Sequence, residues 1–291
     1  MRVMENDNRV ILAVLAHPDD ETFGMGGTLA LYARLGASVY LVCATRGEAG
    51  DVDTEFLRGF RSVAERREAE LRCAAEKLGL AGVNFLEYRD SGMPGSADNQ
   101  HPQALIAAPI EEVAAKIAGY MRQLRPQVVL TFDPLGGYRH PDHIAVHKAT
   151  VSAFELAGQA SFESTLPPYQ PAKLYFQVFP LKFLRFALKI LPFFGVDPRK
   201  FGRNRDIDLT ALIQDSDFPI HAKISHRSVA TQIDQATFCH ASQLSGVSLR
   251  RGSLRWLQYF LGNADYFIRA FPPASADLEE RDLFAGLNHR A

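Results

Sequence analysis

The sequence predicts an α/β fold, a doubly wound and mostly parallel sheet of the Rossmann-like type with a C-terminal elaboration. Short apolar runs typical of buried strands alternate with helix-like segments over about the first 160 residues. A chain of 291 residues that is 47% hydrophobic is long enough to bury one large core. Two His-Pro-Asp sequences each follow a strand-like run, where sheets of this class bind ligands.

The predicted parallel strands are short and apolar, as strands covered on both faces should be. They are Val10–Ala16, Ser38–Ala44, Asn84–Tyr88 and Val128–Phe132. A polar loop rich in Gly, Pro, Ser and Asn follows the third of them, from Asp90 to Ala108.

The helices between these strands are predicted from their end signals. The expected helices are Thr22–Leu35 with Gly36 after it, Ser62–Leu78, one opened by Pro109 as its first residue, and Ile144–Gly158. The second is the clearest, because Ser62 and Glu65 fit a capping box and Gly79 follows the last turn.

Beyond about residue 160 the pattern weakens. We expect a strand at Lys173–Phe179, a short helix at Leu181–Leu191, a helix at Ser225–Ser242 and a strand at Ala264–Phe271. No linker divides this half from the first, so residues 1–291 are interpreted as one catalytic domain. Within it, residues from about 160 to 291 form an elaboration that shapes the pocket.

Bulk composition excludes several classes of protein. The net charge of −1 does not favour a nucleic-acid-binding protein. Three cysteines are too few and too scattered for a disulfide framework or a cysteine zinc site, and they favour a reducing, cytoplasmic location. The N-terminus lacks a signal-peptide core, and the longest apolar stretch, Phe179 to Val196, is interrupted by charges and prolines.

The two His-Pro-Asp sequences predict a metal site. One imidazole and three carboxylates follow the first strand in His17-Pro18-Asp19-Asp20-Glu21, a concentration of negative charge that a divalent cation would offset. The fourth strand is followed by His140-Pro141-Asp142-His143. His17, one carboxylate of the first sequence and one histidine of the second make a three-ligand set, and the remaining aspartate is free to act as a base. The alternative is that Asp19 or Asp20 only caps the next helix.

Four motifs resemble those of the PIG-L/LmbE-like family of zinc-dependent N-deacetylases. Ala16–Glu21 resembles the family signature, and Tyr138–His143 resembles its second motif. Thr45-Arg46-Gly47-Glu48-Ala49-Gly50 resembles a Thr-x-Gly-Glu-x-Gly loop, and Arg67–Leu71 an Arg-x-x-Glu-Leu helix. The resemblance covers residues 9–158 and is weaker afterwards, where 240–243 and 265–267 look like family landmarks.

This resemblance implies a reaction and a set of roles. The ligands of Zn²⁺ would be His17, Asp20 and His143, although a two-histidine, one-carboxylate set also fits Fe²⁺. Asp19 would be the general base, and His140 would stabilise charge or protonate the leaving amine. Asp142 would orient His140, and Tyr138 would reach the developing oxyanion.

Substrate contacts are expected from three further residues. The resemblance makes Arg67 a contact for hydroxyl or phosphate oxygens, where a surface ion pair with Glu70 is the alternative. Asp90, in Arg89-Asp90-Ser91-Gly92-Met93, resembles a residue that contacts sugar or inositol hydroxyls in the branch acting on N-acetylglucosaminyl-inositol and mycothiol conjugates; its alternative role is a local turn. Glu48 would bond the substrate or hold its own loop.

Glu21 and His147, which lie beside the predicted ligands in the sequence, have two interpretations each. Glu21 fits a partner of a metal ligand and a helix first-turn acid equally well. His147 shares the i, i+4 spacing of zinc-binding histidines with His143, but we favour a packed or solvated side chain.

The predicted function is hydrolysis of an N-acyl group, expected to be acetyl, on an amino-sugar derivative such as an N-acetylglucosaminyl conjugate. The alternatives are a catalytically silent carbohydrate-binding protein and a nucleotide-binding protein, the latter raised by Gly24, Gly26 and Gly27. The partner is a small molecule, and no nucleic acid is expected. For the basic aromatic segment 179–205 we weigh a membrane-surface contact against ordinary packing and favour packing. A homo-oligomer is compatible with the sequence.

Overall fold

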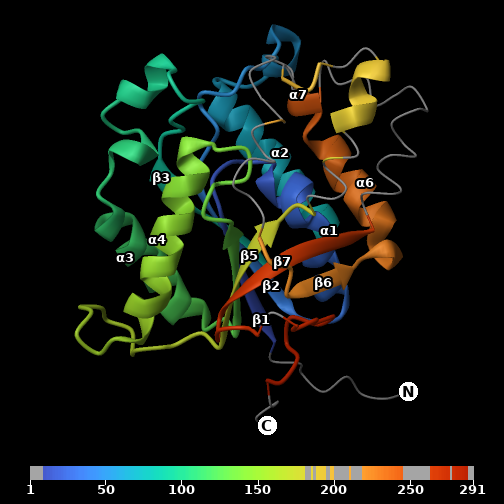
Figure 1. Ribbon diagram of the computed structural model, residues 1–291. Helices are drawn as coiled ribbons and strands as arrows, with labels where there is room; N and C mark the ends of the chain where they lie inside the picture. Colours follow the sequence, from blue (N-terminus) through green and yellow to red (C-terminus); the bar gives the residue numbers. More distant parts are fainter. Residues whose placement is uncertain are drawn as a thin grey trace.

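The computed structural model describes residues 9–180, 185, 188–194, 197–199, 210, 218–244, 263–275 and 277–287. Its strands form one sheet in the order β3-β2-β1-β4-β5-β7-β6 (Figure 1). They are β1 (Val10–Leu15), β2 (Ser38–Thr45), β3 (Gly82–Tyr88), β4 (Val128–Phe132), β5 (Lys173–Val178), β6 (Ala222–Ser225) and β7 (Ala264–Phe271). The first five pair in parallel, whereas β7 is antiparallel to both β5 and β6. The predicted mostly parallel sheet is confirmed.

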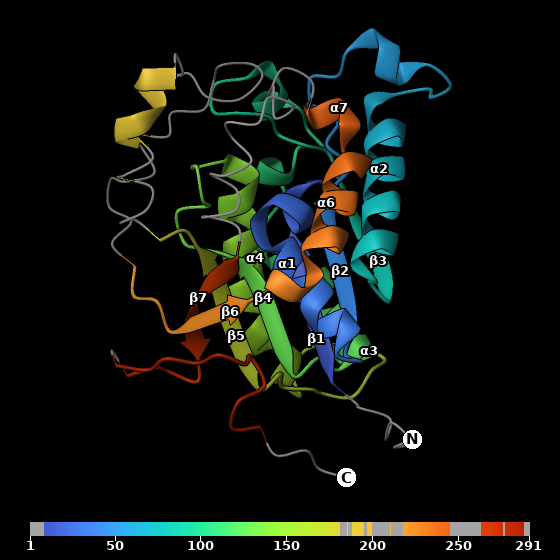
Figure 2. The ribbon, with the colours of Figure 1, turned by 90° about the vertical axis from the view of Figure 1, so that its right-hand side faces the viewer.

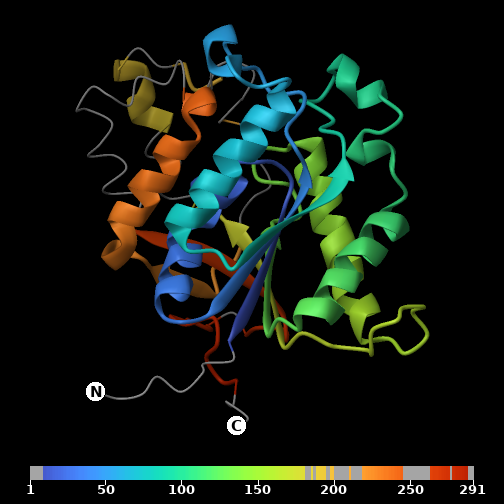
Figure 3. The same cartoon turned by 180° about the vertical axis from the view of Figure 1, so that it is seen from behind.

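Helices cover both faces of this sheet. They are α1 (Asp20–Arg34), α2 (Val63–Leu78), α3 (Ile110–Leu124), α4 (Pro141–Gly158), α6 (Ala230–Cys239) and α7 (Ala241–Leu244). Short 3₁₀ turns connect them: η1 (Thr54–Leu57), η2 (Ala97–Gln100), η3 (Leu105–Ala107), η4 (Leu191–Phe194) and η6 (Arg227–Val229). Helices α3 and α4 pack together on one face, and α1, α2 and α6 lie on the other (Figures 2 and 3).

Local sequence signals account for the best predicted elements. β1 is buried on both faces because it is central, which explains its unbroken apolar run. At the start of α2, Ser62 Oγ accepts a hydrogen bond from the Glu65 amide. The Glu65 carboxylate accepts the Arg61 amide rather than that of Ser62, so the capping box is displaced by one residue. The helix ends at Gly79 in the left-handed conformation, with φ of 77°.

Several predicted boundaries are wrong. α4 begins at Pro141 rather than at Ile144, so the second His-Pro-Asp sequence forms its first turn. Pro109 is the residue before α3, not the first residue within it. The helix expected over Ser225–Ser242 is a strand end followed by η6, α6 and α7. The helix expected at 181–191 lies largely outside the described residues.

The topology brings the two predicted clusters together. The chain leaves β1 toward β2 on one side, and β4 pairs with β1 on the other. The strand order therefore reverses at the carboxyl ends of β1 and β4, which is the place where doubly wound proteins bind ligands. His17 follows β1, and the first turn of α4 lies beyond β4.

Helix α1 is interrupted, and its second segment is capped by a residue of β7. Met25 has non-helical dihedral angles, so two helical segments meet there. The Asp265 carboxylate of β7 caps the second segment by accepting the Thr28 amide at 2.8 Å and the Thr28 hydroxyl at 2.6 Å. A Cβ atom at Gly27 would lie 2.2 Å from the ring of His226, which lies between β6 and η6, so this glycine makes room for that side chain. Gly24, Gly26 and Gly27 lie inside α1 rather than in a loop, so they do not form the glycine-rich loop of a nucleotide-binding protein.

The C-terminal part is tied to the first half at several points. Strands β5, β7 and β6 extend the same sheet, although the predicted domain boundaries stay a prediction. Cys73 of α2 forms a disulfide with Cys239 of α6, 166 residues away. Sequence spacing did not predict this pairing, because it depends on how α2 and α6 pack. Within the described part of the chain, no helix has the length and apolar character needed to cross a bilayer.

Candidate metal centre

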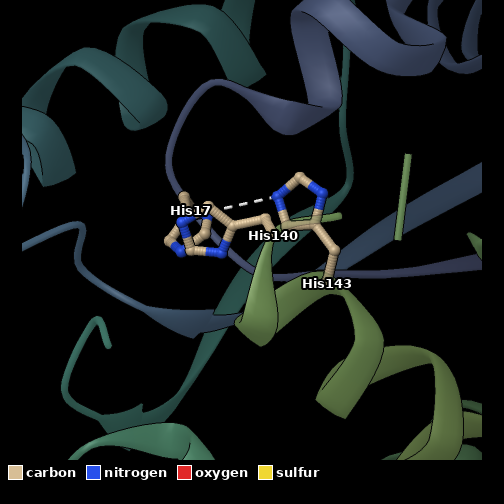
Figure 4. Close-up of side chains that lie close together, drawn as sticks. All are labelled: His17, His140 and His143. Carbon is tan, nitrogen blue, oxygen red and sulfur yellow. Dashed lines mark hydrogen bonds between the residues drawn. The ribbon is translucent and has the colours of Figure 1, made fainter. Parts of the chain in front are cut away.

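Three predicted ligands meet beyond the carboxyl ends of β1 and β4. His17 Nδ1 lies 3.3 Å from His143 Nε2 and 3.5 Å from Asp20 Oδ2, and His143 Nε2 lies 3.2 Å from Asp20 Oδ1. The dashed line in Figure 4 marks the contact between the His17 and His143 rings. A tetrahedral ion with ligand bonds of about 2.1 Å separates its ligand atoms by roughly 3.4 Å. His17 contacts one oxygen of Asp20 and His143 contacts the other, so the three groups lie at distances close to this separation and have the ligand types of a divalent metal site.

Neighbouring carboxylates orient the His17 ring for this role. His17 Nε2 lies 3.1 Å from Asp142 Oδ2 and 3.4 Å from Asp90 Oδ1. A proton held on Nε2 by these acceptors leaves the Nδ1 lone pair directed toward His143 and Asp20. Burial alone would lower the pKa of His17, but Asp90 and Asp142 raise it well above its usual value. The carboxylates around the ring thus favour positive charge near it, whether that of a protonated ring or that of a bound cation, and only the neutral ring offers the Nδ1 lone pair.

The other two predicted ligands, His143 and Asp20, also have partners within the protein. The His143 ring stacks on Phe132, at the end of β4, with centroids 3.9 Å apart. Burial would raise the pKa of Asp20, but His143 and His17 hold it well below its usual value, so this carboxylate is ionised. Asp20 is also the first residue of α1, where a helix N-terminus favours negative charge.

His140 lies beside the ligands but is suited to another role. Its ring centroid is 4.5 Å from that of His17, and the nitrogens of His17, His140 and His143 lie within 4.8 Å of one another (Figure 4). Asp20 stays the predicted third ligand, because its carboxylate contacts both His17 and His143 and supplies negative charge. His140 Nδ1 accepts the Asp142 amide at 3.2 Å, so Nε2 carries the proton of the neutral ring. Burial, with His17 and His143, lowers the pKa of His140 to about 2.

Asp142 contacts His140 through its backbone and His17 through its carboxylate. Its backbone amide holds His140, whereas its carboxylate lies against His17 Nε2 and accepts the Ser91 amide at 2.9 Å. The predicted orienting of His140 by Asp142 thus has a backbone contact to support it. The ring of Tyr138 lies edge-on to the His140 and His143 rings, at 5.8 and 5.1 Å between centroids. Burial raises the pKa of the Tyr138 hydroxyl, which keeps it protonated.

Asp19, next to the ligands, has a strained backbone. Its φ of 134° is costly for a residue other than glycine, by about 1–3 kcal/mol, and persists only where the surroundings enforce it. The Asp19 amide donates to Glu21 Oε2 at 3.0 Å, and Arg67 Nη2 donates to Asp19 Oδ2 at 3.1 Å. Desolvation raises the pKa of Asp19 to about 6, although Arg67 opposes the shift. A carboxyl group with this pKa is a suitable general base near neutral pH.

Arg67 is buried, and its described hydrogen bonds are to the protein. Besides Asp19, its guanidinium donates to the carbonyls of Pro18 at 2.8 Å and Gly47 at 3.1 Å. A Cβ atom at position 47 would lie 2.2 Å from Arg67 Nη1, so the glycine of the Thr45–Gly50 loop makes room for this side chain. Glu70, the expected ion-pair partner, instead binds Arg66 and Ser242. A substrate contact by Arg67 stays a prediction.

The other two expected substrate residues border the same cluster. Asp90 is buried and accepts the Gly92 amide at 2.8 Å; burial would raise its pKa, but His17 and Arg67 hold it far below the usual value. Glu48 Oε2 accepts the Asp90 amide at 3.0 Å, which fixes the Thr45–Gly50 loop to the end of β3. Their contacts with a substrate stay predictions. His147 is packed, as favoured, with Nδ1 donating to the Phe132 carbonyl at 2.8 Å.

Sequence reasoning missed one contact of the site. His240, at the junction of α6 and α7, is fully buried, and its Nε2 lies 2.7 Å from Glu21 Oε1. Burial would lower the pKa of His240, but the Glu21 carboxylate raises it above its usual value. The His-Ala-Ser-Gln sequence at 240–243 was the only signal, and it does not identify a partner 219 residues away.

The doubly wound sheet and the His-Asp-His cluster at its switch point define an α/β protein with a candidate metal centre. Residues 12–154 match the family described as "PIG-L: GlcNAc-PI de-N-acetylase". A 1D-myo-inositol 2-acetamido-2-deoxy-alpha-D-glucopyranoside deacetylase of Kineococcus radiotolerans is 46% identical over 206 residues, which are 65% of this chain and 57% of that protein. The Catenulispora acidiphila deacetylase 2 of the same name is 34% identical over 97% of this chain and 98% of its own length. The chain therefore belongs to the PIG-L family.

Solved structures agree on the fold. The N,N'-diacetylchitobiose deacetylase of Pyrococcus horikoshii, solved with an inhibitor, superposes with a TM-score of 0.62 over 90% of this chain and 84% of its own. The two sequences are 20% identical, so this likeness supports the architecture alone.

Proposed function

We propose that this protein is a metal-dependent hydrolase that removes the N-acetyl group from an N-acetylglucosaminyl-inositol conjugate. One observation carries the proposal: His17 Nδ1 and His143 Nε2 lie 3.3 Å apart and each contacts one oxygen of the Asp20 carboxylate, at 3.5 and 3.2 Å, with Asp19 in a strained backbone conformation next to Asp20. Membership of the PIG-L family and the names of the near-full-length relatives support the reaction and the substrate class.

The donor set fits a divalent cation. Two imidazoles and one carboxylate, all buried or nearly so, suit Zn²⁺ and also Fe²⁺. When bound, such a cation supplies Lewis acidity that polarises the amide carbonyl and acidifies a water molecule. Asp90 and Asp142 would hold His17 in the tautomer that this requires.

The protein's own groups would move the protons. Asp19, held ionised near neutral pH, would take a proton from the attacking water and later deliver it to the departing nitrogen. Neutral His140 would donate a hydrogen bond from Nε2 to the oxygen that gains negative charge. Of the two roles that the sequence left open for His140, this one agrees better with its low pKa. Tyr138, protonated, would be a second donor to that oxygen.

The sugar and inositol contacts are proposed for the rim of this cluster. Glu48 lies on the Thr45–Gly50 loop and is partly exposed, which leaves a free carboxylate edge for hydroxyl groups. Asp90 and Arg67 are mostly engaged within the protein, so their influence on the substrate would be through the shape and charge of the site.

The first test measures amine release from 1D-myo-inositol 2-acetamido-2-deoxy-α-D-glucopyranoside by the wild-type protein and by Asp19→Asn. We expect deacetylation by the wild type. The variant should lose about 10²–10⁴-fold in kcat, the usual contribution of a general base, and keep its metal. A loss of less than about tenfold would contradict the role of Asp19. Absence of amine release by metal-loaded wild type would contradict the proposed function.

The second test concerns the metal. His17→Ala, Asp20→Ala and His143→Ala should each lower the bound metal measured by elemental analysis, because each removes one of three ligands. His147→Ala is the matched control, since that imidazole bonds the Phe132 carbonyl instead. Chelation should abolish activity, and reloading with Zn²⁺ or Fe²⁺ identifies which ion restores it. Full metal occupancy in all three ligand variants would show that the site lies elsewhere.

A further inference from the structure

The backbone of Asp19 needs an external support. Its φ of 134° and ψ of −26° lie outside the conformations that a non-glycine residue adopts readily. The Asp19 carbonyl accepts the amides of Thr22 and Phe23 at 3.0 and 2.9 Å, as expected at a helix start. Its amide donates to Glu21 Oε2 at 3.0 Å. The Glu21 carboxylate is therefore the group that holds this peptide from its amide side.

Glu21 in turn depends on His240. The Glu21 side chain is fully buried, and a buried carboxylate stays ionised only where it has hydrogen-bond partners. Oε2 is used by the Asp19 amide, and Oε1 contacts the Thr22 hydroxyl and His240 Nε2, the latter at 2.7 Å. His240 is the partner that comes from outside α1.

The segment that carries His240 is fixed on both sides. Cys239, directly before it, is linked to Cys73 of α2 by the disulfide. Ser242, two residues after it, donates its amide and its hydroxyl to the two oxygens of Glu70, at 2.9 and 2.7 Å. His240 thus reaches Glu21 from a segment anchored to α2, and its ring lies 5.7 Å from that of Phe23.

We propose that His240 is a positioning residue for deacetylation: through Glu21 it holds the Asp19 peptide, and thereby the Asp19 carboxylate, in its working geometry. The inference rests on the proposed role of Asp19 as general base. His240 itself touches neither substrate nor metal ligand in this scheme. It gives the C-terminal part of the chain a direct effect on the rate of the reaction.

A second histidine provides a matched control. His226 is also buried, also precedes a helical segment of the C-terminal part, and also pairs with a carboxylate that binds α1: its Nε2 lies 3.2 Å from Asp265 Oδ1. Asp265 holds Thr28, in the second segment of α1, rather than Asp19. Loss of either imidazole therefore removes a partner of a carboxylate that binds the α1 region. Only the carboxylate held by His240, that of Glu21, also binds the proposed general base Asp19.

The kinetic experiment compares His240→Gln with His226→Gln, using the inositol substrate named above. His240→Gln should lower kcat by about 10- to 100-fold, the effect of misplacing a catalytic group, with KM and bound metal changed by less than about threefold. His226→Gln should lower the thermal midpoint similarly but leave kcat within about threefold. In an Asp19→Asn background, His240→Gln should have no further effect on kcat, because the group that it positions is absent.

A second readout does not need activity. Hydrogen exchange at the Asp19 amide should be slow in the wild type and in His226→Gln, and faster by about tenfold or more in His240→Gln. If His240→Gln does not fold, Glu21→Gln replaces it, since an amide of the same shape cannot accept hydrogen bonds with both of its terminal atoms.

The possible results separate the two proposals. Unchanged kcat and unchanged exchange in His240→Gln would overturn the positioning role, as would a further loss of kcat in the Asp19→Asn background. If the wild type releases no amine while exchange at Asp19 accelerates in His240→Gln, the proposed function fails and the support of the Asp19 peptide by His240 stands.

Discussion

Arg67 illustrates how one side chain's role depends on what it faces. The family motif associates it with substrate, whereas its guanidinium spans the Pro18 carbonyl, the Gly47 carbonyl and the Asp19 carboxylate. A planar group with five donors can bridge three acceptors in this way, and an ammonium group cannot do so in the same geometry. The described contacts therefore favour a role in fixing Asp19.

Arg67→Lys distinguishes the two interpretations of this residue. If Arg67 fixes Asp19, the variant should lower kcat by about 10- to 100-fold and leave KM within about threefold, because orientation of the base is lost. If Arg67 binds substrate, KM should rise while kcat stays near the wild-type value. Steady-state amine release measures both constants. The second result would restore the substrate contact predicted from the sequence.

Helix α4 shows how an element divides histidines of the same type between roles. His143, in its first turn, reaches the site, while His147 one turn later turns toward the Phe132 carbonyl and the Phe176 ring. Burial lowers the pKa of His147, so the ring is neutral in the folded protein. The position of α4 over β4, rather than the i, i+4 spacing, decides which histidine contacts His17.

The low pKa of His147 predicts a pH dependence of stability. Below an unfolded-state pKa of about 6.5 the unfolded chain binds a proton that the folded chain does not, so stability falls as the pH falls. The limit for one group is about 1.4 kcal/mol per pH unit. His147→Asn keeps a donor for Phe132 but cannot titrate. Urea unfolding between pH 7 and pH 5 should show a shallower loss of stability for the variant, and equal slopes would contradict the assignment.

At the scale of the whole molecule, the C-terminal part completes what the first half begins. Strands β5 and β7 continue the sheet, Asp265 caps the second segment of α1, and α6 is bonded to α2. A buried ion pair between Lys173 and Glu280, at 2.7 Å, joins β5 to a segment near the C-terminus. These contacts explain why the support for Asp19 can come from residue 240.

The disulfide should contribute to the stability of the whole chain. Because Cys73 and Cys239 are 166 residues apart, the link restricts a long loop of the unfolded chain. Cys73→Ala with Cys239→Ala should lower the free energy of unfolding by about 2–5 kcal/mol. Thiol titration of the denatured wild type should find one free thiol before reduction, that of Cys43, and three after it. Equal stability of the variant and the wild type would contradict this estimate.

The sequence by itself determined the strands and the groups placed at their ends. Apolar runs fixed β1 and β4, and parallel strands end at the same edge of a sheet, so His17 and His143 could be predicted to meet. The helix boundaries were less certain at α4, because Pro141 is compatible with both a loop and a first helical turn.

Only the tertiary structure decided what surrounds Asp19. The contact of Arg67 with Asp19 spans 48 residues, that of His240 with Glu21 spans 219, and the disulfide spans 166. Such partners are chosen by the packing of helices on a sheet, and periodicity within a segment carries no information on them. Local sequence therefore predicted which residues gather at the candidate site, whereas long-range packing determines which residues hold them in place.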